Sequence, residues 1–210
     1  MYNIRVMKVE RIVGEYLDSN VFVVGNDHDV VLIDASAKIE NVKRVVANRK
    51  VLAILLTHGH YDHSVFANEY ASEFGCKVYA SGHVQKYLID ADWNCSDGHF
   101  AVEDFSKFAF LSGDGELDFG EIVVEYKSMG GHSLADMLYK IEDEIFVGDL
   151  LIGRDMGRID LKGGDKKQMI ESLKTLLAEK YTVMHSGHGT DNKKEVQDKI
   201  LKLWIRFLDR

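Results

Sequence analysis

The sequence contains no proline and only two cysteines, Cys76 and Cys95. Two thiols cannot form a disulfide framework, so their scarcity agrees with a reducing compartment. Without proline, the tight turns must be made by the 18 glycines together with Asn, Asp and Ser. No apolar run approaches the roughly 20 residues that a membrane helix needs, and we therefore expect no membrane partner.

The chain also lacks a dense tract of Lys and Arg. Its 26 basic and 34 acidic residues give a net charge of -8, which disfavours extended binding to nucleic acid. The first residues, MYNIRVMKVERIVGEY, carry charges every few positions and lack the apolar segment of a signal peptide. We expect a soluble, cytoplasmic protein whose residues 1–210 form one domain.

Apolar patterning predicts a mixed α/β chain in which a second sheet follows the first. Runs of strand length predict strands over residues 4–9, 21–24, 30–33, 51–56, 78–80, 122–126, 137–141, 145–147 and 182–184. Helical spacing predicts helices over residues 39–46, 64–75, 83–91, 168–178 and 196–208. Residues 92–115 fit neither pattern and are interpreted as loop, with room for a short helix.

The most informative segment is THGHYDHS, residues 57–64, which directly follows the apolar run VLAILL. It places His58, His60, Asp62 and His63 within six positions, where a buried strand ends. Alternation along an extended segment lets His58 and His60 point the same way. Neutral imidazoles and a carboxylate suit zinc or iron in the two-plus state, so the segment predicts a metal site.

Three further residues share this placement after an apolar strand and beside glycine: His132 in GGHS, Asp149 in VGD and His188 in SGHG. Taken singly, each is often an ordinary residue of a glycine turn. Together with the first segment they supply seven candidate ligands, the number that two ions use if each takes three ligands and both share one carboxylate. Such a pair is typical of hydrolytic two-metal sites.

With IFVGDLLIGRDMGRIDLKGGD (145–165) and SGHGTDNKKE (186–195), these motifs resemble the metallo-β-lactamase superfamily. Within it, they resemble the small hydroxyacylglutathione hydrolase (glyoxalase II-like) branch. The resemblance implies a four-layer αββα sandwich and two divalent metal ions, with zinc first and iron or manganese as alternatives. By that resemblance one ion is held by His58, His60 and His132, the other by Asp62, His63 and His188. Asp149 bridges them, and Asp34 orients a ligand imidazole.

The resemblance implies a metal-dependent hydrolase of thioesters such as hydroxyacylglutathione, with a hydroxide bridging two metal ions as the nucleophile. Asp62 is the expected catalytic residue, because it ligates one ion and orients this nucleophile. The main alternative is a persulfide dioxygenase with one iron; a lactonase or phosphodiesterase and a non-catalytic metal-binding module are less favoured. The expected partner is a small-molecule substrate, and the chain is expected to be a monomer or homodimer.

Two features depart from the family pattern. Leu134-Ala135 stands where members commonly have Pro-Gly after the ligand histidine. Members that hydrolyse glutathione thioesters efficiently often carry an additional C-terminal helical domain, and we expect none here. Arg154 and Arg158 are cations that an anionic substrate would use, but a structural salt bridge is the favoured interpretation. The other histidines, among them His185, are interpreted as structural or solvent-exposed.

Overall fold

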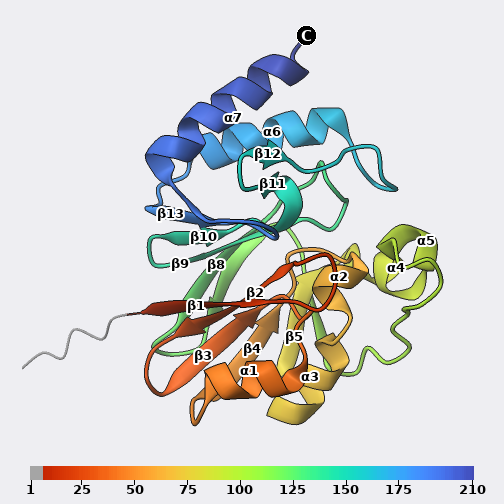
Figure 1. The fold of residues 1–210 in the computed structure, drawn as a ribbon, viewed down its shortest axis with the longest axis vertical. Coiled ribbons are helices and arrows are strands. Elements are labelled where there is room, and N and C mark those ends of the chain that lie inside the picture. Colours follow the sequence, from red (N-terminus) through yellow and green to blue (C-terminus); the bar gives the residue numbers. More distant parts are fainter. Residues whose placement is uncertain (1–6) are drawn as a thin grey trace, which may run out of the picture.

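Two six-stranded β-sheets lie face to face between two layers of helices in the computed structural model, which describes residues 7–210 (Figure 1). Helices α1 to α5 lie outside the first sheet, and α6 and α7 lie outside the second. This arrangement confirms the expected αββα sandwich. Within residues 7–210, no helix combines the length and apolar character that a membrane span needs.

The first sheet contains, in spatial order, β1 (Lys8–Val13), β2 (Asn20–Gly25), β3 (Asp29–Ile33), β4 (Lys50–Leu55), β5 (Lys77–Ser81) and β6 (Phe108–Leu111). The first three strands form an antiparallel meander, and the strands from β3 to β6 run parallel. The helices between these strands are α1 (Ile39–Val46), α2 (Tyr61–Ser64), α3 (Ala67–Phe74), α4 (Val84–Ile89) and α5 (Ala91–Asn94). Parallel pairing directs β3, β4 and β5 toward the same end of the sheet.

The second sheet contains, in spatial order, β14 (Asn192–Lys193), β13 (Val183–His185), β10 (Glu144–Phe146), β9 (Met137–Ile141), β8 (Val123–Ser128) and β7 (Asp114–Asp118). Only the pair of β10 and β13 is parallel. The small hairpin of β11 (Leu151–Ile152) and β12 (Asp155–Met156) follows the short 3-10 turn Gly148–Leu150. Helices α6 (Lys166–Ala178) and α7 (Lys194–Leu208) cover the outer face.

Three apolar layers hold the sandwich together, because strand side chains alternate between the two faces of a sheet. In β2, Val21 and Val23 pack toward α1 to α5, whereas Phe22 and Val24 pack between the sheets. The third layer joins the second sheet to α6 and α7. Strands such as β2 and β3 are therefore covered on both faces, which explains why they read as nearly continuous apolar runs.

Several predicted boundaries are wrong. The strand predicted over 4–9 is β1, which continues to Val13; residues 4–6 lie outside the described residues. The predicted helix over 64–75 is α3, and a separate short helix, α2, begins at Tyr61. The predicted helix over 83–91 is divided at Asp90 into α4 and α5. Residues 92–115 contain β6 and the start of β7, because pairing with β5 and β8 defines these short edge strands.

The apolar side chains of α7, which contains the helix predicted over residues 196–208, are only partly buried. Leu208 is buried and Trp204 packs against the core. Leu203 and Phe207, however, are 65% and 61% exposed, so they do not belong to the core.

Candidate metal centre

All seven predicted ligands lie together at one end of the sandwich, where strands of both sheets end. β4 leads into His58 and His60, and α2 carries Asp62 and His63. The loops after β8, β10 and β13 bring His132, Asp149 and His188 to the same place. Their ligand-type atoms gather, within 4.8 Å, into three overlapping groups: His58, His60 and His132; Asp62, His63 and His188; and His58, His63 and Asp149.

The first triad consists of three imidazoles, those of His58, His60 and His132. His132 Nδ1 donates to the backbone oxygen of Arg158 at 2.8 Å, so its Nε2 faces His60 Nδ1 at 2.9 Å. Burial, followed by the neighbouring histidines, lowers the pKa of His58 well below its usual range; burial lowers the pKa of His60 to about 3. His58 Nε2 is buried without a hydrogen-bond partner. Unprotonated nitrogens of this kind are the form of imidazole that binds metals.

The second triad, Asp62, His63 and His188, combines a carboxylate with two imidazoles. His63 Nδ1 contacts Asp34 Oδ2 at 2.8 Å, and His188 Nδ1 donates to the backbone oxygen of Leu17 at 2.9 Å. Both Nε2 atoms therefore face each other, 3.2 Å apart. Two imidazole nitrogens on one tetrahedral zinc ion lie about 3.3 Å apart, since each Zn–N bond is about 2.0–2.1 Å long. The observed spacing fits a shared cation.

The pKa values of the second triad indicate the same preference. Burial alone would lower the pKa of His63, but the carboxylates of Asp149, Asp62 and Asp34 raise it to about 9. Burial is likewise outweighed at His188, whose pKa rises to about 10 through Asp149 and Asp62. The surrounding carboxylates thus stabilise positive charge at this place.

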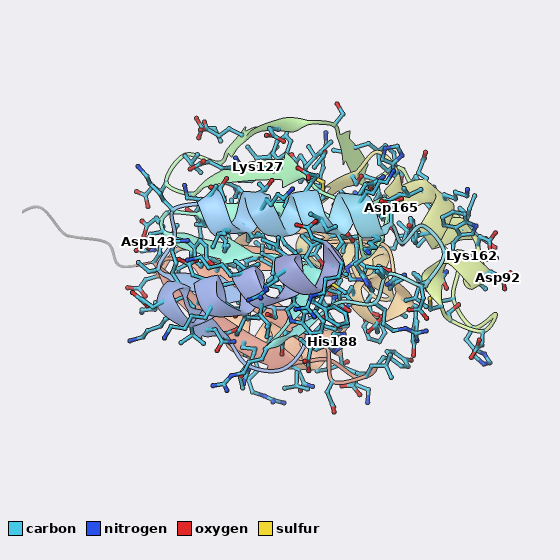
Figure 2. All side chains as sticks on the ribbon, turned by 90° about the horizontal axis from the view of Figure 1, so that it is seen from above. Asp92, Lys127, Asp143, Lys162, Asp165 and His188 are labelled. Atoms are coloured by element: carbon cyan, nitrogen blue, oxygen red, sulfur yellow. The ribbon has the colours of Figure 1, made fainter. Side chains whose placement is uncertain are left out.

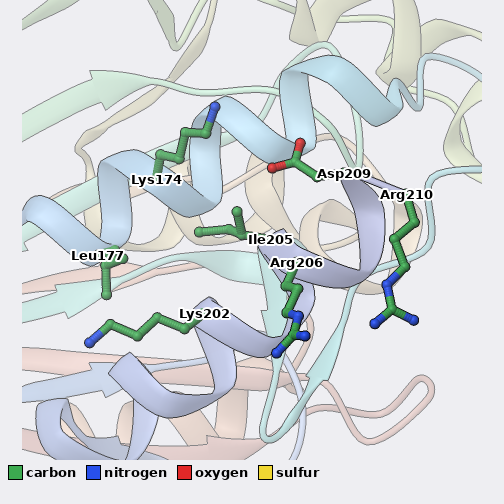
Figure 3. Close-up of a pocket in the computed structure, with 7 residues that line it drawn as sticks. All are labelled: Lys174, Leu177, Lys202, Ile205, Arg206, Asp209 and Arg210. Carbon is green, nitrogen blue, oxygen red and sulfur yellow. The ribbon is translucent and has the colours of Figure 1, made fainter.

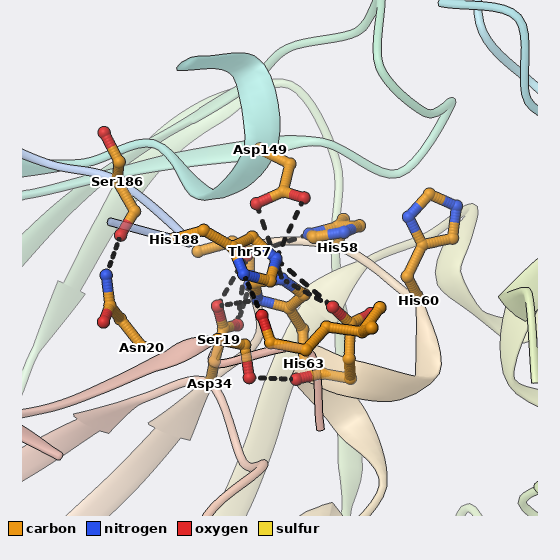
Figure 4. Close-up of polar contacts among 12 residues, drawn as sticks. Ser19, Asn20, Asp34, Thr57, His58, His60, His63, Asp149, Ser186 and His188 are labelled. Atoms are coloured by element: carbon orange, nitrogen blue, oxygen red, sulfur yellow. Dashed lines mark hydrogen bonds and ion pairs between the residues drawn. The ribbon is translucent and has the colours of Figure 1, made fainter. Parts of the chain in front are cut away.

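Asp149 lies between the two triads (Figure 4). Its Oδ1 is 3.4 Å from His63 Nε2, and its Oδ2 is 3.4 Å from His188 Nε2 and 3.9 Å from His132 Nε2. Although burial opposes ionisation, His63 and His188 hold the pKa of Asp149 well below its usual range. Oδ1 is buried without a hydrogen-bond partner. An ionised, unsatisfied carboxylate between two sets of imidazoles fits a ligand shared by two divalent ions.

Asp34 directs the imidazole of His63, as the resemblance implies. It is buried and adopts the left-handed backbone conformation, with φ at 63°, which is uncommon outside glycine. Its carboxylate accepts hydrogen bonds from Thr57 N at 2.7 Å and from Thr57 Oγ1 at 2.8 Å, besides contacting His63. These contacts fix which nitrogen of His63 faces the centre.

Two glycines beside the ligands are required by close approach. A Cβ at Gly187 would lie 2.1 Å from Asp149 Oδ1, and one at Gly148 would lie 2.5 Å from Thr57 Oγ1. Both distances are far below van der Waals contact, so no larger residue fits without displacing Asp149 or Thr57. The absence of a side chain at these glycines therefore lets the backbone approach the centre closely.

Asp136 organises the turn that departs from the family pattern. Its Oδ2 accepts hydrogen bonds from the backbone nitrogens of His132 and Ser133 at 3.0 and 2.9 Å. Its Oδ1 accepts a 2.5 Å hydrogen bond from Ser133 Oγ. Sequence reasoning missed Asp136, although an acidic residue three positions after a serine is a recognised capping signal. The turn holds His132 without Pro-Gly.

Residues 154–162 contain three cations, two of which are paired. Arg158 makes two hydrogen bonds to Asp160, at 2.9 and 2.7 Å, as expected for a structural salt bridge. Lys162 pairs with Asp92 at 2.7 Å, and Figure 2 shows the two side by side at one end of the molecule. Arg154 is exposed and makes no ion pair with residues 7–210.

His185, interpreted from sequence as structural or exposed, is buried. Its Nε2 is 2.5 Å from Glu144 Oε2, and its Nδ1 is 3.2 Å from Asp191 Oδ1. The structural interpretation therefore fits this histidine, which lies outside the groups of clustered ligand atoms.

A separate cavity of about 540 Å³ lies between α6 and α7 (Figure 3). Its walls are Lys174, Leu177, Lys202, Ile205, Arg206, Asp209 and Arg210. None of the seven predicted ligands lines this cavity, so it is separate from the candidate metal centre.

Several known proteins are similar to this chain in sequence or in structure. A probable metallo-hydrolase of Bacillus subtilis, YqgX, is 30% identical, and the aligned region covers 88% of this chain and 92% of the relative. The hydroxyacylglutathione hydrolase GloC of Haemophilus influenzae is 28% identical over 75% of this chain and 76% of its own. The crystal structure of TTHA1623 in a di-iron-bound form is 26% identical, with a TM-score of 0.80 over 91% of this chain and 98% of that one. The sequence pattern of the metallo-β-lactamase superfamily matches residues 14–188, and the chain belongs to this superfamily.

Proposed function

We propose that this member of the metallo-hydrolase superfamily hydrolyses small thioesters, hydroxyacylglutathione among them, with two divalent metal ions. The observation that carries the proposal is the place of Asp149, an ionised carboxylate between two complete triads. The name of the Haemophilus influenzae relative and the di-iron form of TTHA1623 support the substrate class and the two-ion centre.

In this proposal His58, His60 and His132 hold one ion, Asp62, His63 and His188 hold the other, and Asp149 contacts both. Imidazole and carboxylate ligands suit zinc, which we propose first, with iron or manganese as alternatives. Such ions, when bound, lower the pKa of water toward neutrality and polarise an acyl carbonyl.

Asp62 is the residue that we propose orients the attacking water. Burial would raise its pKa, but His63 and His188 lower it below the ordinary value, so the carboxylate stays ionised at neutral pH. An ionised carboxylate accepts a hydrogen bond from water and so directs its lone pair toward the acyl carbon. A thiolate leaving group needs little protonation, because thiols are far more acidic than alcohols. The proposal therefore requires no separate general acid.

A persulfide dioxygenase with a single iron is the competing proposal. It binds its iron through two histidines and an aspartate but keeps the same loop, so the number of ions per chain separates the two proposals. Here the ligand atoms of Asp62, His63 and His188 lie within 4.8 Å of one another, as do those of the first triad, and two sets of ligands support two ions and hydrolysis.

The test is to strip the protein with a chelator, restore Zn²⁺, Mn²⁺ or Fe²⁺, and measure hydrolysis of S-lactoylglutathione and simple acyl thioesters. We expect turnover with at least one metal, and its loss in His58→Asn. His83→Asn, which changes an exposed histidine, is the matched control. No turnover with any metal would contradict the proposal, and one iron per chain with oxygen uptake on glutathione persulfide would favour the dioxygenase.

A further inference from the structure

Two adjacent buried residues at the start of β2, Ser19 and Asn20, contact the backbone of both segments that supply the second triad. Ser19 Oγ donates a 2.6 Å hydrogen bond to the backbone oxygen of Asp62 and shares another, at 2.7 Å, with Ser36 Oγ. Both Ser19 and Asn20 are buried, at 0% and 2% exposure. Neither residue supplies an atom to the clustered ligands.

Asn20 binds the loop that carries His188 on both sides of that histidine. Its Nδ2 donates to the backbone oxygens of Ser186 at 2.9 Å and Gly189 at 3.2 Å. Its backbone nitrogen donates to Gly187 O at 2.6 Å. The bond to Ser186 is drawn in Figure 4, where Asn20 lies directly below Ser186, to the left of the ligands.

These contacts connect two segments that are far apart in sequence. Asp62 and His63 belong to α2, between β4 and β5 of the first sheet, whereas His188 belongs to the loop between β13 and β14 of the second sheet. Gly187 N also donates to Gly148 O at 2.8 Å, so the same loop is fixed to the turn that carries Asp149. The relative position of the two segments therefore depends on the Ser19–Asn20 pair.

We propose that Ser19 and Asn20 are positioning residues that set the affinity of the second triad for its metal ion. This inference rests on the proposed two-ion centre. A purely structural role would destabilise the whole sandwich and affect both ions alike. A positioning role weakens the second ion selectively, because the first triad is reached by neither side chain.

The test compares Asn20→Ala with Asn26→Ala. Asn26 is the matched control because it is a buried asparagine at the other end of the same strand region. Its side chain bonds Glu121, His28 and Asp29 rather than the centre. Each protein is stripped with a chelator, checked by thermal unfolding, and titrated with Zn²⁺ against a competing chelator.

We expect two ions per chain in the wild type and in Asn26→Ala. In Asn20→Ala the second ion should bind about 10–100-fold more weakly, the usual cost of losing an outer hydrogen-bond partner, with the first ion unchanged. Ser19→Ala removes one hydroxyl and should weaken the second ion in the same selective way. It serves as the second probe if Asn20→Ala does not fold.

Three results would overturn the inference. Wild-type affinity for both ions in Asn20→Ala and Ser19→Ala would show that the pair does not position the triad. Equal weakening of both ions would assign it a general structural role. A wild-type protein that binds one ion at every Zn²⁺ concentration would refute the two-ion centre itself, and this is seen before any variant is compared.

Discussion

Replacing Asp34 by Asn tests how one buried carboxylate selects the metal-binding nitrogen of His63. Asn tolerates the left-handed backbone that this position requires, with φ at 63°, so the change removes charge without adding strain. In the native chain Oδ1 accepts from Thr57 N at 2.7 Å and Oδ2 contacts His63 Nδ1 at 2.8 Å. An asparagine that keeps the bond to Thr57 N must place its amide nitrogen against His63 Nδ1.

An amide nitrogen is a donor only, so it opposes a protonated Nδ1. His63 can relieve this contact by carrying its proton on Nε2, the atom that faces His188 at 3.2 Å. A proton there removes the lone pair that an ion needs. Loss of such an outer partner typically lowers metal affinity 10–100-fold, or about 1.4–2.7 kcal/mol.

The assay is Zn²⁺ titration against a chelator, combined with nitrogen NMR of the imidazole tautomers. We expect Asp34→Asn to weaken the second ion alone and to shift the proton of His63 to Nε2. Asp136→Asn is the matched control, since it changes a buried carboxylate that contacts the turn of His132 instead. Wild-type affinity for both ions in Asp34→Asn, with His63 still protonated on Nδ1, would refute the reasoning.

Three further predictions concern packing, pH and metal removal. Gly187→Ala places a Cβ 2.1 Å from Asp149 Oδ1, so we expect loss of metal and of turnover; an unchanged metal content by elemental analysis would contradict this. Although burial opposes it, Asp191 and Glu144 raise the pKa of His185, so its contribution to stability is fully present below about pH 6.5 and is lost as pH rises through the folded-state value. The difference in melting temperature between wild type and His185→Gln should therefore shrink toward alkaline pH in chelated protein, and a difference that grows would count against it. Adding Zn²⁺ at 100 times the Kd to stripped protein should raise the free energy of unfolding by about 2.7 kcal/mol and so raise the melting temperature. An unchanged melting temperature would argue against specific binding.

The ligand residues could be predicted from sequence because each follows an apolar strand that the fold directs to one end of a sheet. His58 and His60 come directly after β4, and Asp149 comes just after β10. The glycine beside Asp149 is also visible in the sequence, and the structure shows that close packing excludes a side chain there. Strand ends, glycines and ligand-type residues are local signals, so they can be recognised in the sequence without knowledge of the tertiary contacts.

The residues that hold these ligands in place were not predictable in the same way. Ser19 and Asn20 follow the hairpin turn after β1, and nothing in their own segment points to Asp62 or to the His188 loop. Their partners lie 43 and 166 positions away, respectively. Such contacts exist only after both sheets have packed. Edge strand β6 was missed for a related reason, because its pairing with β5 defines it more than its own pattern does.

The two triads differ in charge, and this difference predicts how each responds to pH. Burial and neighbouring histidines lower the pKa of His58, and burial lowers that of His60 to about 3, so these two imidazoles are unprotonated at neutral pH. Against burial, the carboxylates raise the pKa of His63 to about 9 and that of His188 to about 10, so the metal-free second triad holds at least one proton at neutral pH. An ion must displace that proton, and its apparent affinity should rise about tenfold per pH unit for each proton released. In Zn²⁺ titrations at pH 6.5 and 8.5, the affinity of the second triad should therefore rise far more than the affinity of the first. An equal rise at both triads would show that the carboxylates do not control proton binding at the second triad.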